Sequence, residues 1–471
     1  MLNILKQYYP IRNIIFFMIE GAVIFFSVLL ALVIFTYSNS FLFDLFIILR
    51  ISVVTVVCQI SLYYNDLYDF EVASTVSEMI IRLMQSLGVT SIALAVIYFY
   101  FPMVIIDEVI FALSIFLLLV FVVAWRLIYI SILNKGMFNE SIVILGSSRL
   151  ASDILNEIDT HLDCGYTVMA VIPDSIHGHV NNNSEPVNKR IADRELINVD
   201  KTEFCDAVIN MGVRKVVEAL QDKRSFFPAE ELLKCRVAGV DVIEGTTFYE
   251  MLTGKLPVTF INPSWLIFSS GFRKSGFKAF IKRLIDIVAS LILIVLLLPL
   301  LLITAFLIKI DSKGQILFAQ DRVGQNKKEY MMYKFRSMKQ NAEKTSGPVW
   351  AKDNDDRITR VGRVIRKFRI DELPQLWNVL TGTMSMVGPR PERKHFTDQL
   401  EKAIPYYSER FTVKPGITGW AQVCYDYGAS VEDAIEKLNY DLFYIKNMSI
   451  MMDVVIILRT IKTVLFGRGA R

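Results

Sequence analysis

Residues Ile287–Ile308 read IVASLILIVLLLPLLLITAFLI and include no charged side chain. A helix of about 20 apolar residues is long enough to cross a bilayer. Pro299 lies near the middle of the run, where proline removes a helical hydrogen bond and clashes with the preceding turn. The stretch therefore predicts either a re-entrant helix that breaks at Pro299 and returns to its own side of the membrane, or a simple span.

The charges at the two ends of this run favour the re-entrant form. Lys282 and Arg283 precede the run, and Lys309 and Lys313 follow it. Cations at both ends suit the headgroup layer of a single membrane face. A further crossing would place everything after the run on the opposite side from the residues before it. We therefore expect the run to enter and leave on the cytoplasmic side.

Four further apolar stretches lie nearer the N-terminus, and each has about the length of a membrane span. They are Ile14–Tyr37, Phe43–Tyr64, Met79–Phe101 and Val104–Ile132. Basic residues before the first stretch and at the end of the fourth place both ends of the predicted bundle in the cytoplasm. Some charged side chains fall inside or near the stretches, and the sequence assigns them no role: Glu20, Asp44, Arg50 and Arg82.

Residues 139–264 alternate short apolar runs with amphipathic ones. Strands are expected at Ser141–Leu145, Val168–Ile172, Ala207–Ile209 and Val240–Ile243, with helices up to Ile158 and over Glu230–Ala238. This alternation predicts a parallel, Rossmann-like sheet. The phosphate-binding motif expected after the first strand is degenerate. Gly146-x-Ser148-x-x-Ala151 stands where dinucleotide-binding proteins have G-x-G-x-x-G. The pattern leaves open whether this part binds a nucleotide or keeps only the fold.

The composition is that of a membrane protein. The chain of 471 residues is 53% hydrophobic and carries a formal net charge of +4, which gives no indication of a nucleic-acid partner. Its five cysteines are scattered, which favours reduced thiols facing a cytoplasm over disulfides or a metal site. The N-terminus lacks a signal-peptide cleavage pattern, so the first apolar stretch is expected to stay in the mature protein.

A cluster of charges follows the re-entrant run, in the stretch Arg366–Thr397, RKFRIDELPQLWNVLTGTMSMVGPRPERKHFT. Asp371 and Glu372 come directly after basic residues, and the apolar residues behind them recur with the period of a helix. Asp371 is therefore expected as a helix N-cap or first-turn residue. The turn Gly388-Pro389-Arg390-Pro391 returns a guanidinium to the same region. Two carboxylates among arginines can bind a phosphate and a divalent cation, although such a pair is more often only a cap.

The second half of the chain resembles the bacterial sugar transferase family, the polyisoprenyl-phosphate hexose-1-phosphate transferases, also called monotopic phosphoglycosyl transferases. Six blocks carry the resemblance in order: Lys282-Arg283-Leu-Ile-Asp286, Phe318-Ala-Gln320-Asp-Arg322-Val-Gly324, Tyr333-Lys334-Phe335-Arg336-Ser337-Met338, Asp371-Glu372-Leu-Pro374-Gln375-Leu-Trp377-Asn378, Gly388-Pro389-Arg390-Pro391 and Pro415-Gly416-Ile-Thr418-Gly419-Trp420-Ala421-Gln422. The succession of four spans, a Rossmann-like part and this module is similar to the large members of the family. The pieces Tyr427–Asp433 and Gly467–Arg471 look like its exopolysaccharide branch, part of which is associated with exosortase systems.

The resemblance implies a reaction and a site. A sugar 1-phosphate moves from a UDP-sugar to undecaprenyl phosphate, UMP is released, and exopolysaccharide synthesis begins. Asp371 is implied as the nucleophile of a covalent phosphosugar-enzyme, and Glu372 as its metal-associated partner, the two holding Mg²⁺. Arg366 and Arg390 match arginines that hold phosphate oxygens, and Pro299 matches the family's helix-breaking proline. The sugar itself is not identified by any residue.

The resemblance also implies where the protein works and with what. We expect a multi-pass protein of the bacterial inner membrane, with the active site on the cytoplasmic face. A homodimer is expected, and other polysaccharide-assembly enzymes are further expected partners. Some residues of the six blocks have two interpretations, as part of the phosphate and nucleotide site or as purely structural groups: Lys334, Arg336, Arg322, Asp286, Trp420 and Gln422.

The predicted organisation has three parts: a four-span bundle over 1–135, a Rossmann-like cytoplasmic domain over 136–272, and a re-entrant helix with a catalytic α+β domain over 273–471. Two other functions are compatible with such a chain. A membrane scaffold for polysaccharide assembly would keep the fold without needing Asp371. A membrane-bound nucleotide-sugar dehydratase needs an intact glycine loop and a Tyr-x-x-x-Lys pair on a helix, whereas Tyr330-x-x-x-Lys334 falls in a strand-like run here.

Overall fold

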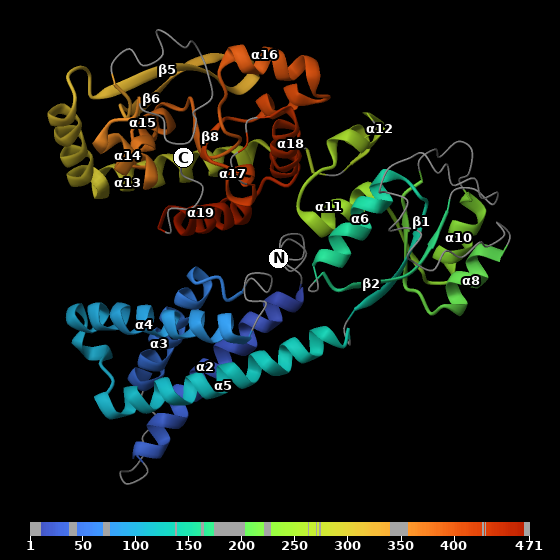
Figure 1. Cartoon of the computed structure of the whole chain (residues 1–471), viewed down its shortest axis with the longest axis horizontal. Coiled ribbons are helices and arrows are strands. Elements are labelled where there is room, and N and C mark those ends of the chain that lie inside the picture. The colour runs from blue at the N-terminus through green and yellow to red at the C-terminus, as the bar shows by residue number, and fades with distance from the viewer. Residues whose placement is uncertain are drawn as a thin grey trace. The chain divides into compact units, whose positions relative to one another are not determined.

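The computed structural model describes residues 11–36, 45–68, 76–136, 139–161, 164–173, 203–220, 228–261, 263–269, 271–272, 275–339, 357–425, 428 and 430–465 (Figure 1). The chain divides into two compact units, Met1–Phe248 and Tyr249–Arg471. The finer division into three domains, with boundaries after residues 135 and 272, stays a prediction.

Long apolar helices open the first unit, coloured blue to cyan in Figure 1. Their bounds are α2 (Ile11–Thr36), α3 (Leu45–Tyr64), α4 (Val76–Tyr100) and α5 (Glu108–Asn134), with the 3₁₀-turn η1 (Pro102–Val104) before the last. Each helix coincides with a predicted span to within a few residues, and each is long and apolar enough to cross a membrane. Side chains from all of them meet in a buried apolar core that includes Ile24, Leu62, Leu83 and Val122.

A buried ion pair joins α2 to α5. The Glu20 carboxylate lies 2.7 Å from Arg126 Nε, and neither side chain is more than 2% exposed. Arg126 also donates to the carbonyl of Leu67, 2.6 Å away and just beyond the end of α3, and its guanidinium lies over the rings of Phe16 and Tyr68. One guanidinium therefore links three helices through charge, hydrogen-bond and cation–π contacts.

Replacing Glu20 by Gln is expected to lower the free energy of unfolding by about 3–5 kcal/mol, because the buried Arg126 charge would lose its counter-ion. Thermal unfolding of the purified chain in lipid nanodiscs measures the change. The double variant Glu20→Leu, Arg126→Met removes both charges and should recover most of the loss. A Glu20→Gln chain as stable as the parent would contradict a charged pair.

Two other charged residues of the bundle connect neighbouring segments. Arg50 Nε donates to the carbonyl of Met103 at 3.0 Å. Arg82 lies 3.5 Å from the Asp66 carboxylate. These contacts give both arginines a role in packing the helices. Asp44, the remaining charged residue near the spans, lies outside the described residues.

The rest of the first unit is built on a parallel sheet with strand order β2-β1-β3-β4. Its elements are β1 (Glu140–Leu145), α6 (Arg149–Thr160), β2 (Tyr166–Ile172), α8 (Phe204–Asn210), β3 (Lys215–Glu218), α10 (Ala229–Val237) and β4 (Asp241–Glu244). The strand predicted at Ala207–Ile209 is wrong, because these residues belong to α8 and place Val208 in the core. A short apolar run does not by itself distinguish a strand from a buried helical turn.

The turn after β1 is closed by the chain itself. Gly146 has a φ of +120°, and a Cβ at this position would come within 2.3 Å of the Ala219 carbonyl. Ser148 Oγ donates to the same carbonyl at 2.6 Å and also accepts from the backbone N–H of Ala151 as the N-cap of α6. Parallel sheets commonly bind phosphates at this edge. Here the glycine and the serine of the degenerate motif both serve a contact between β1 and β3.

The second unit begins inside α11 and contains the following elements: α11 (Gly245–Thr253), η3 (Val258–Phe260), α12 (Pro263–Phe268), α13 (Gly276–Asp311), β5 (Leu317–Val323), η4 (Gln325–Lys327), β6 (Glu329–Phe335), α14 (Arg360–Lys367), η5 (Ile370–Glu372), α15 (Gln375–Thr381), β7 (Ser385–Val387), α16 (Lys394–Ala403), η6 (Tyr407–Thr412), β8 (Gly416–Thr418), α17 (Trp420–Cys424), α18 (Val431–Lys446) and α19 (Ile450–Leu465). Strands β5 and β6 form an antiparallel hairpin, and β7 pairs with β8 in parallel.

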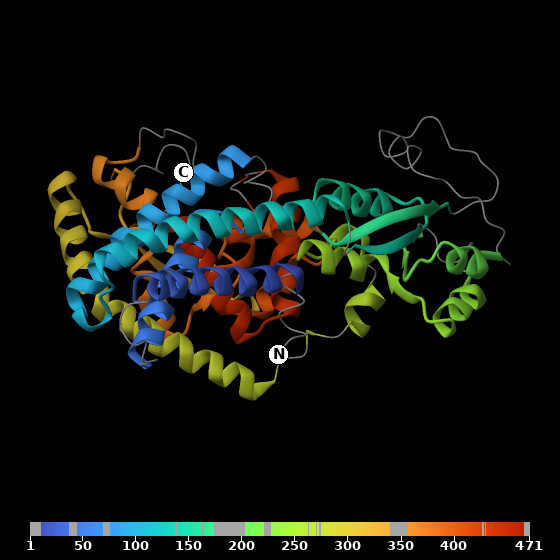
Figure 2. The same cartoon turned by 90° about the horizontal axis from the view of Figure 1, so that it is seen from below.

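Helix α13 keeps its helical backbone through Pro299. Figures 1 and 2 show that the helix changes direction along its length. A proline inside a helix produces such a bend, because its ring clashes with the preceding turn and its N–H is missing. The break expected at Pro299 is therefore a bend and not an interruption.

Both ends of α13 are bound to the second unit. Near its start, Asp286 accepts from the Ser385 hydroxyl at 2.8 Å and from the backbone N–H of Met386 at 3.1 Å. At its end, Asp311 accepts from the backbone N–H of Val361 at 3.1 Å. Many apolar side chains between these anchors are exposed, among them Val295, Leu296, Leu302 and Phe306. Helix α13 is thus tied to one folded body at both ends and apolar on its free surface.

Candidate active site

Asp371 and Glu372 are the last two residues of the one-turn 3₁₀-helix η5. Arg369 precedes this turn with a φ of +54°, a left-handed conformation that residues other than glycine rarely adopt. Helix α15 begins only at Gln375 and has no side-chain cap, so the prediction of Asp371 as its N-cap or first-turn residue is wrong. The left-handed turn and η5 together place the two carboxylates ahead of the helix. The helix ends at Thr381, and Gly382 follows it in the left-handed conformation.

Glu372 is buried and bound by two cations. Its Oε1 atom accepts from Lys334 Nζ at 2.9 Å and from an Arg390 guanidinium nitrogen at 2.8 Å. Burial alone raises the pKa of a carboxyl, but Arg390, Lys334 and Arg369 outweigh it and hold the pKa of Glu372 well below its ordinary value. Glu372 is therefore ionised at neutral pH and fixes the positions of Lys334 and Arg390.

Asp371 has a different electrostatic environment. Burial and the adjacent charge of Glu372 raise its pKa to about 6, although Lys334, Arg366 and Arg390 oppose the shift. Neighbouring groups whose protonation equilibria are pushed apart in this way are common in active sites. The pair therefore consists of one fixed anion and one carboxyl that titrates near neutral pH.

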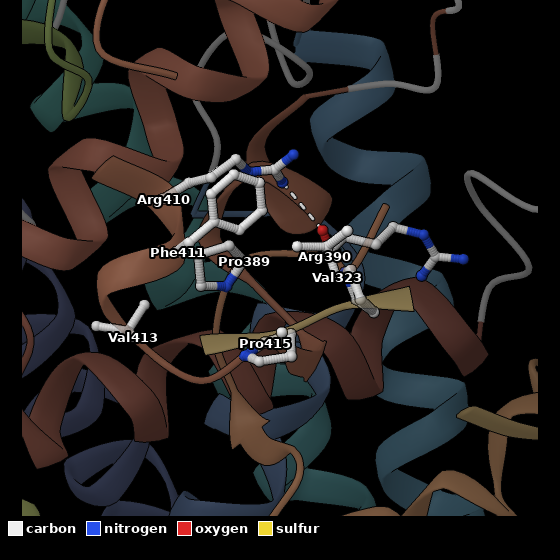
Figure 3. Close-up of a pocket in the computed structure, with 9 residues that line it drawn as sticks. Val323, Pro389, Arg390, Arg410, Phe411, Val413 and Pro415 are labelled. Carbon is white, nitrogen blue, oxygen red and sulfur yellow. Dashed lines mark hydrogen bonds between the residues drawn. The ribbon is translucent and has the colours of Figure 1, made fainter. Parts of the chain in front are cut away.

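The loop that carries Arg390 follows β7 and is held through its backbone. Arg410 donates to the Arg390 carbonyl at 2.9 Å, and Arg322 donates to the Pro391 carbonyl at 3.2 Å. Figure 3 shows the hydrogen bond from Arg410, while the Arg390 guanidinium extends away from the small apolar pocket lined by Pro389, Phe411, Val413 and Pro415. The loop backbone is thus fixed on one side and its side chain is presented to Glu372 on the other.

Arg410 is itself part of a buried group. It pairs with the Asp441 carboxylate at 2.9 Å and donates to the Tyr407 hydroxyl. Both ions are almost fully buried, and Arg410 satisfies three acceptors: the Asp441 carboxylate, the Tyr407 hydroxyl and the Arg390 carbonyl. The sequence reasoning did not single out this pair. Arg410 and Asp441 stand far apart in the chain, and neither lies in one of the six quoted blocks.

The sequence left six residues of the quoted blocks with either a binding or a structural role. Of these, Lys334 is the one that contacts the dyad, which is the pair of carboxyls Asp371 and Glu372. It lies in strand β6 with Tyr330, so the Tyr330-x-x-x-Lys334 spacing is not on a helix. Arg336, the residue just after this strand, instead donates to the carbonyls of Ser312 and Lys313 after α13. Two further candidates contact other segments and not the carboxylates. Asp286 accepts from the backbone of β7, and Arg322 donates to the backbone of the loop that carries Arg390.

Trp420 and Gln422 have structural contacts. The Trp420 indole N–H donates to the Gly254 carbonyl at 2.8 Å, and the Arg459 guanidinium lies 4.8 Å from its ring centre. Gln422 donates weakly to the Ile417 carbonyl at 3.5 Å. These contacts tie α17 to the residues after α11 and to α19. A nucleotide-binding role for the two side chains stays a prediction.

Asn378, a residue that the sequence analysis quoted but gave no role, connects α15 to β6. Its side chain is buried, accepts from the Tyr333 backbone N–H at 3.1 Å, and donates to the Met331 carbonyl at 2.8 Å and to Thr383 Oγ1 at 3.2 Å. An amide is needed, because the contact uses one acceptor and two donors. Asn378 therefore fixes the strand next to Lys334 against the helix that follows the dyad.

The nearly isosteric change Asn378→Asp is expected to destabilise the fold by about 1–3 kcal/mol, because a carboxylate would face the Met331 carbonyl with nothing to donate. Thermal unfolding of both proteins measures the effect. Asn326→Asp, in the exposed η4 turn, is a matched control and should change little. Equal unfolding temperatures for Asn378→Asp and the control would contradict the bridging role.

The described residues offer few metal donors. They contain no cluster of three or more His, Cys, Asp or Glu side chains that could hold a metal ion. Glu372 Oε1 is taken by two cations, which leaves its second oxygen and the Asp371 carboxylate. Mg²⁺ commonly binds one or two protein carboxylates and fills its shell with phosphate oxygens and water. The donor set therefore fits Mg²⁺ that arrives with a phosphate substrate.

Comparison with known proteins places this geometry in a family. The sequence model for the family described as bacterial sugar transferase matches residues 277–467, which include all of α13 but its first residue, both strands of the β5–β6 hairpin, Asp371, Glu372 and the loop that carries Arg390. The exopolysaccharide production protein PSS of Rhizobium leguminosarum bv. phaseoli is 42% identical over 195 residues, 40% of this chain and 98% of that protein.

Longer relatives match the chain over a similar or somewhat greater length. The UDP-N-acetylgalactosamine-undecaprenyl-phosphate N-acetylgalactosaminephosphotransferase of Aeromonas hydrophila is 47% identical over 240 residues, 51% of this chain and 56% of the relative. The UDP-glucose:undecaprenyl-phosphate glucose-1-phosphate transferase of Escherichia coli (strain K12) is 40% identical over 191 residues, 40% of each chain. The match thus spans about half or less of the length of these longer relatives. Because a whole short relative is covered at this identity, the chain belongs to the bacterial sugar transferase family.

Proposed function

We propose that the protein transfers a sugar 1-phosphate from a UDP-sugar to undecaprenyl phosphate and releases UMP, which initiates an exopolysaccharide. The observation that carries the proposal is the state of the two adjacent carboxyls. Glu372 is fixed as an anion by Lys334 and Arg390, while the pKa of Asp371 is raised to about 6. One group can organise cations for phosphate binding and the other can act as a nucleophile.

In the first half-reaction, a carboxylate oxygen of Asp371 forms a bond to the phosphorus that carries the sugar. The bond from this phosphorus to the bridging oxygen breaks, and UMP leaves with the electron pair. Arg390, Lys334 and Arg366 surround the dyad with positive charge and offset the negative charge of the phosphates. Their positions are set before substrate arrives, because Glu372 and the loop contacts already hold two of them.

In the second half-reaction, an oxygen of undecaprenyl phosphate bonds to the same phosphorus and the Asp371 carboxylate leaves. No net proton transfer is needed at Asp371, since it begins and ends ionised. Mg²⁺ bound by the free carboxylate oxygens of Asp371 and Glu372 would supply charge neutralisation of the diphosphate when present.

The lipid acceptor requires the dyad to lie at the membrane surface. We infer that α13 is re-entrant, because Asp286 and Asp311 bind it at two points to one unit, whereas a straight helix would hold these two residues about 38 Å apart. The catalytic unit is then expected on the cytoplasmic face of the inner membrane. A homodimer and contacts with other polysaccharide-assembly enzymes stay predictions.

The relatives favour one class of donor. The two named for N-acetylgalactosamine are 47% and 49% identical over their matches, and those named for glucose are 40–43% identical. We therefore propose a UDP-N-acetylhexosamine, with UDP-N-acetylgalactosamine first, as the donor. UMP release from a panel of UDP-sugars, with polyprenyl phosphate and with or without EDTA, tests donor, acceptor and metal together. Release of more than one UMP per enzyme molecule that needs neither the lipid nor a divalent ion would refute the proposal.

The rate of UMP release is expected to fall about tenfold for each pH unit below about 6, because only ionised Asp371 is a nucleophile. The contribution of Asp371 to the stability of the fold has the opposite pH dependence, because it decreases as the pH rises. The pKa of Asp371 in the folded chain lies above its ordinary 3.8, so its contribution to stability is present below pH 3.8 and lost as pH rises to about 6. Single-turnover rates from pH 5 to 8 check the first statement. A pH-independent rate would contradict the assigned nucleophile.

A further inference from the structure

Helix α12 (Pro263–Phe268) exposes a pair of large apolar side chains outside the region matched by the family model. Ile267 is 74% exposed and Phe268 is 85% exposed. A tandem apolar pair at this exposure is costly in water and typically marks a contact surface. The question is what covers it.

The pair is held in place by contacts on either side. On α12 itself, Trp265 makes a cation–π contact, in which Lys446 Nζ lies 4.4 Å from the centre of its ring. Lys446 is also paired with the buried Glu250. Just after the helix, the backbone of Gly271 passes so close to the Lys446 carbonyl that a Cβ there would come within 2.7 Å. The exposed side chains therefore belong to a segment docked on α18, and a partner would meet them in a defined position.

The same exposed apolar character continues into α13. Phe277 is 72% and Phe280 is 67% exposed in its first turns, with the exposed Lys278 between them. The chain from Phe268 to Ser275 can span at most about 25 Å, so the two sets lie within that distance of one another. Helix α13 then becomes the long apolar helix whose free surface has the composition of a membrane segment. Aromatic and aliphatic side chains next to a lysine are typical of helices that lie in the headgroup layer.

We propose that α12 is an interfacial anchor, which inserts Ile267 and Phe268 into the headgroup layer of the bilayer that receives α13. The occupant is lipid and not protein, because the pair is continuous in the chain with the start of the membrane helix and is followed by cationic side chains. The anchor would fix the level of the second unit on the membrane through Trp265 and Lys446. The inference rests on the proposed insertion of α13, but not on the chemistry at Asp371.

Fluorescence quenching on the full chain in nanodiscs that contain phosphatidylglycerol tests the proposal. Single cysteines at Phe268, at Leu296 of α13 and at Val237 of α10 would carry the environment-sensitive dye NBD, with the labelled parent chain as the blank for its native cysteines. Val237 is the matched control, since it is 83% exposed and lies in the α/β part. The expected result is that doxyl-labelled lipid quenches the dye at residues 268 and 296, and that iodide in solution quenches it only at residue 237.

Each other outcome has a separate meaning. Iodide quenching at residue 268, with lipid quenching at 296, would overturn the anchor and leave the membrane insertion of α13 intact. Shielding of residue 268 from both quenchers would overturn it in favour of a protein contact, such as a second copy. Failure of lipid quenching at 296 as well would refute the insertion of α13, and with it both the anchor and the proposed membrane placement. None of these readouts depends on turnover.

Discussion

The variant Asp371→Asn should release UMP from the UDP-sugar at least about 1,000-fold more slowly than the parent, because an amide cannot form the bond to phosphorus that the carboxylate forms. The fold should survive the change. Since burial and Glu372 raise the pKa of Asp371 to about 6, its ionised form is unfavourable in the folded chain, and the neutral amide removes that cost above pH 6. Lost activity with equal or higher unfolding temperature is therefore the expected signature.

Rapid-quench measurement of UMP release and trapping of a phosphosugar-enzyme from radiolabelled UDP-sugar check this prediction. Asp321→Asn is the matched control, because Asp321 is an exposed carboxylate of the β5–β6 hairpin in the same unit, and it should leave the rate unchanged. UMP release at the parental rate from Asp371→Asn would show that no covalent intermediate forms on this residue. It would also revive the alternative of a scaffold in which the dyad is dispensable.

The second large effect is expected for Glu372→Gln. The amide keeps the shape of the side chain but leaves Lys334 and Arg390, whose side chains are 19% and 35% exposed, without their shared anion. Removing one partner of a fully buried ion pair typically costs about 3–5 kcal/mol of stability, and the partial exposure of the two cations lowers the expected loss to about 2–3 kcal/mol. Activity should fall as well, by about 100-fold, because the two cations would lose the geometry in which they meet the phosphates.

Thermal unfolding and steady-state rates measure these two losses, and a surface pair supplies the comparison. Lys327 and Glu401 form an ion pair that is largely exposed, and Glu401→Gln should change stability by less than about 1 kcal/mol. The pH dependence has a definite sign. The folded pKa of Glu372 is held below 4.5, so its stabilisation is present above pH 4.5 and is lost as the pH falls below that value. If Glu372→Gln were as stable and active as the parent, Glu372 would have no role in positioning Lys334 and Arg390.

Much of the architecture was predictable because it depends on local patterns. Apolar length located α2 to α5 and α13, and the alternation of short apolar and amphipathic runs located β1, β2 and β4. Short elements were not predicted correctly. Strand β3 was not predicted, and part of α8 was expected as a strand. Such elements acquire their identity from the core that they join, and the local sequence carries too little periodicity to decide.

The candidate site was predictable in its residues but not in its arrangement. Asp371, Glu372, Lys334 and Arg390 all lie in quoted blocks, yet the sharing of one Glu372 oxygen by two cations depends on strands and loops that meet only in the fold. The Arg410–Asp441 pair behind the loop and the Glu20–Arg126 pair in the bundle were missed for the same reason. Partners that are distant in the chain leave no spacing signal, and local helix rules also misplaced Asp371 relative to α15.

The raised pKa of Asp371 has a consequence for the energetics of the whole transfer. A phosphate monoester such as UMP loses its second proton near pH 6, and polyprenyl phosphate belongs to the same chemical class. The proposed carrier, Asp371, has a pKa of about 6, so donor, carrier and acceptor would have similar basicity. A sugar phosphate that is transferred among groups of similar basicity has a similar free energy on each of them. The transfer would then run in either direction, and the direction of synthesis would be set by the removal of UMP and of the lipid-linked sugar.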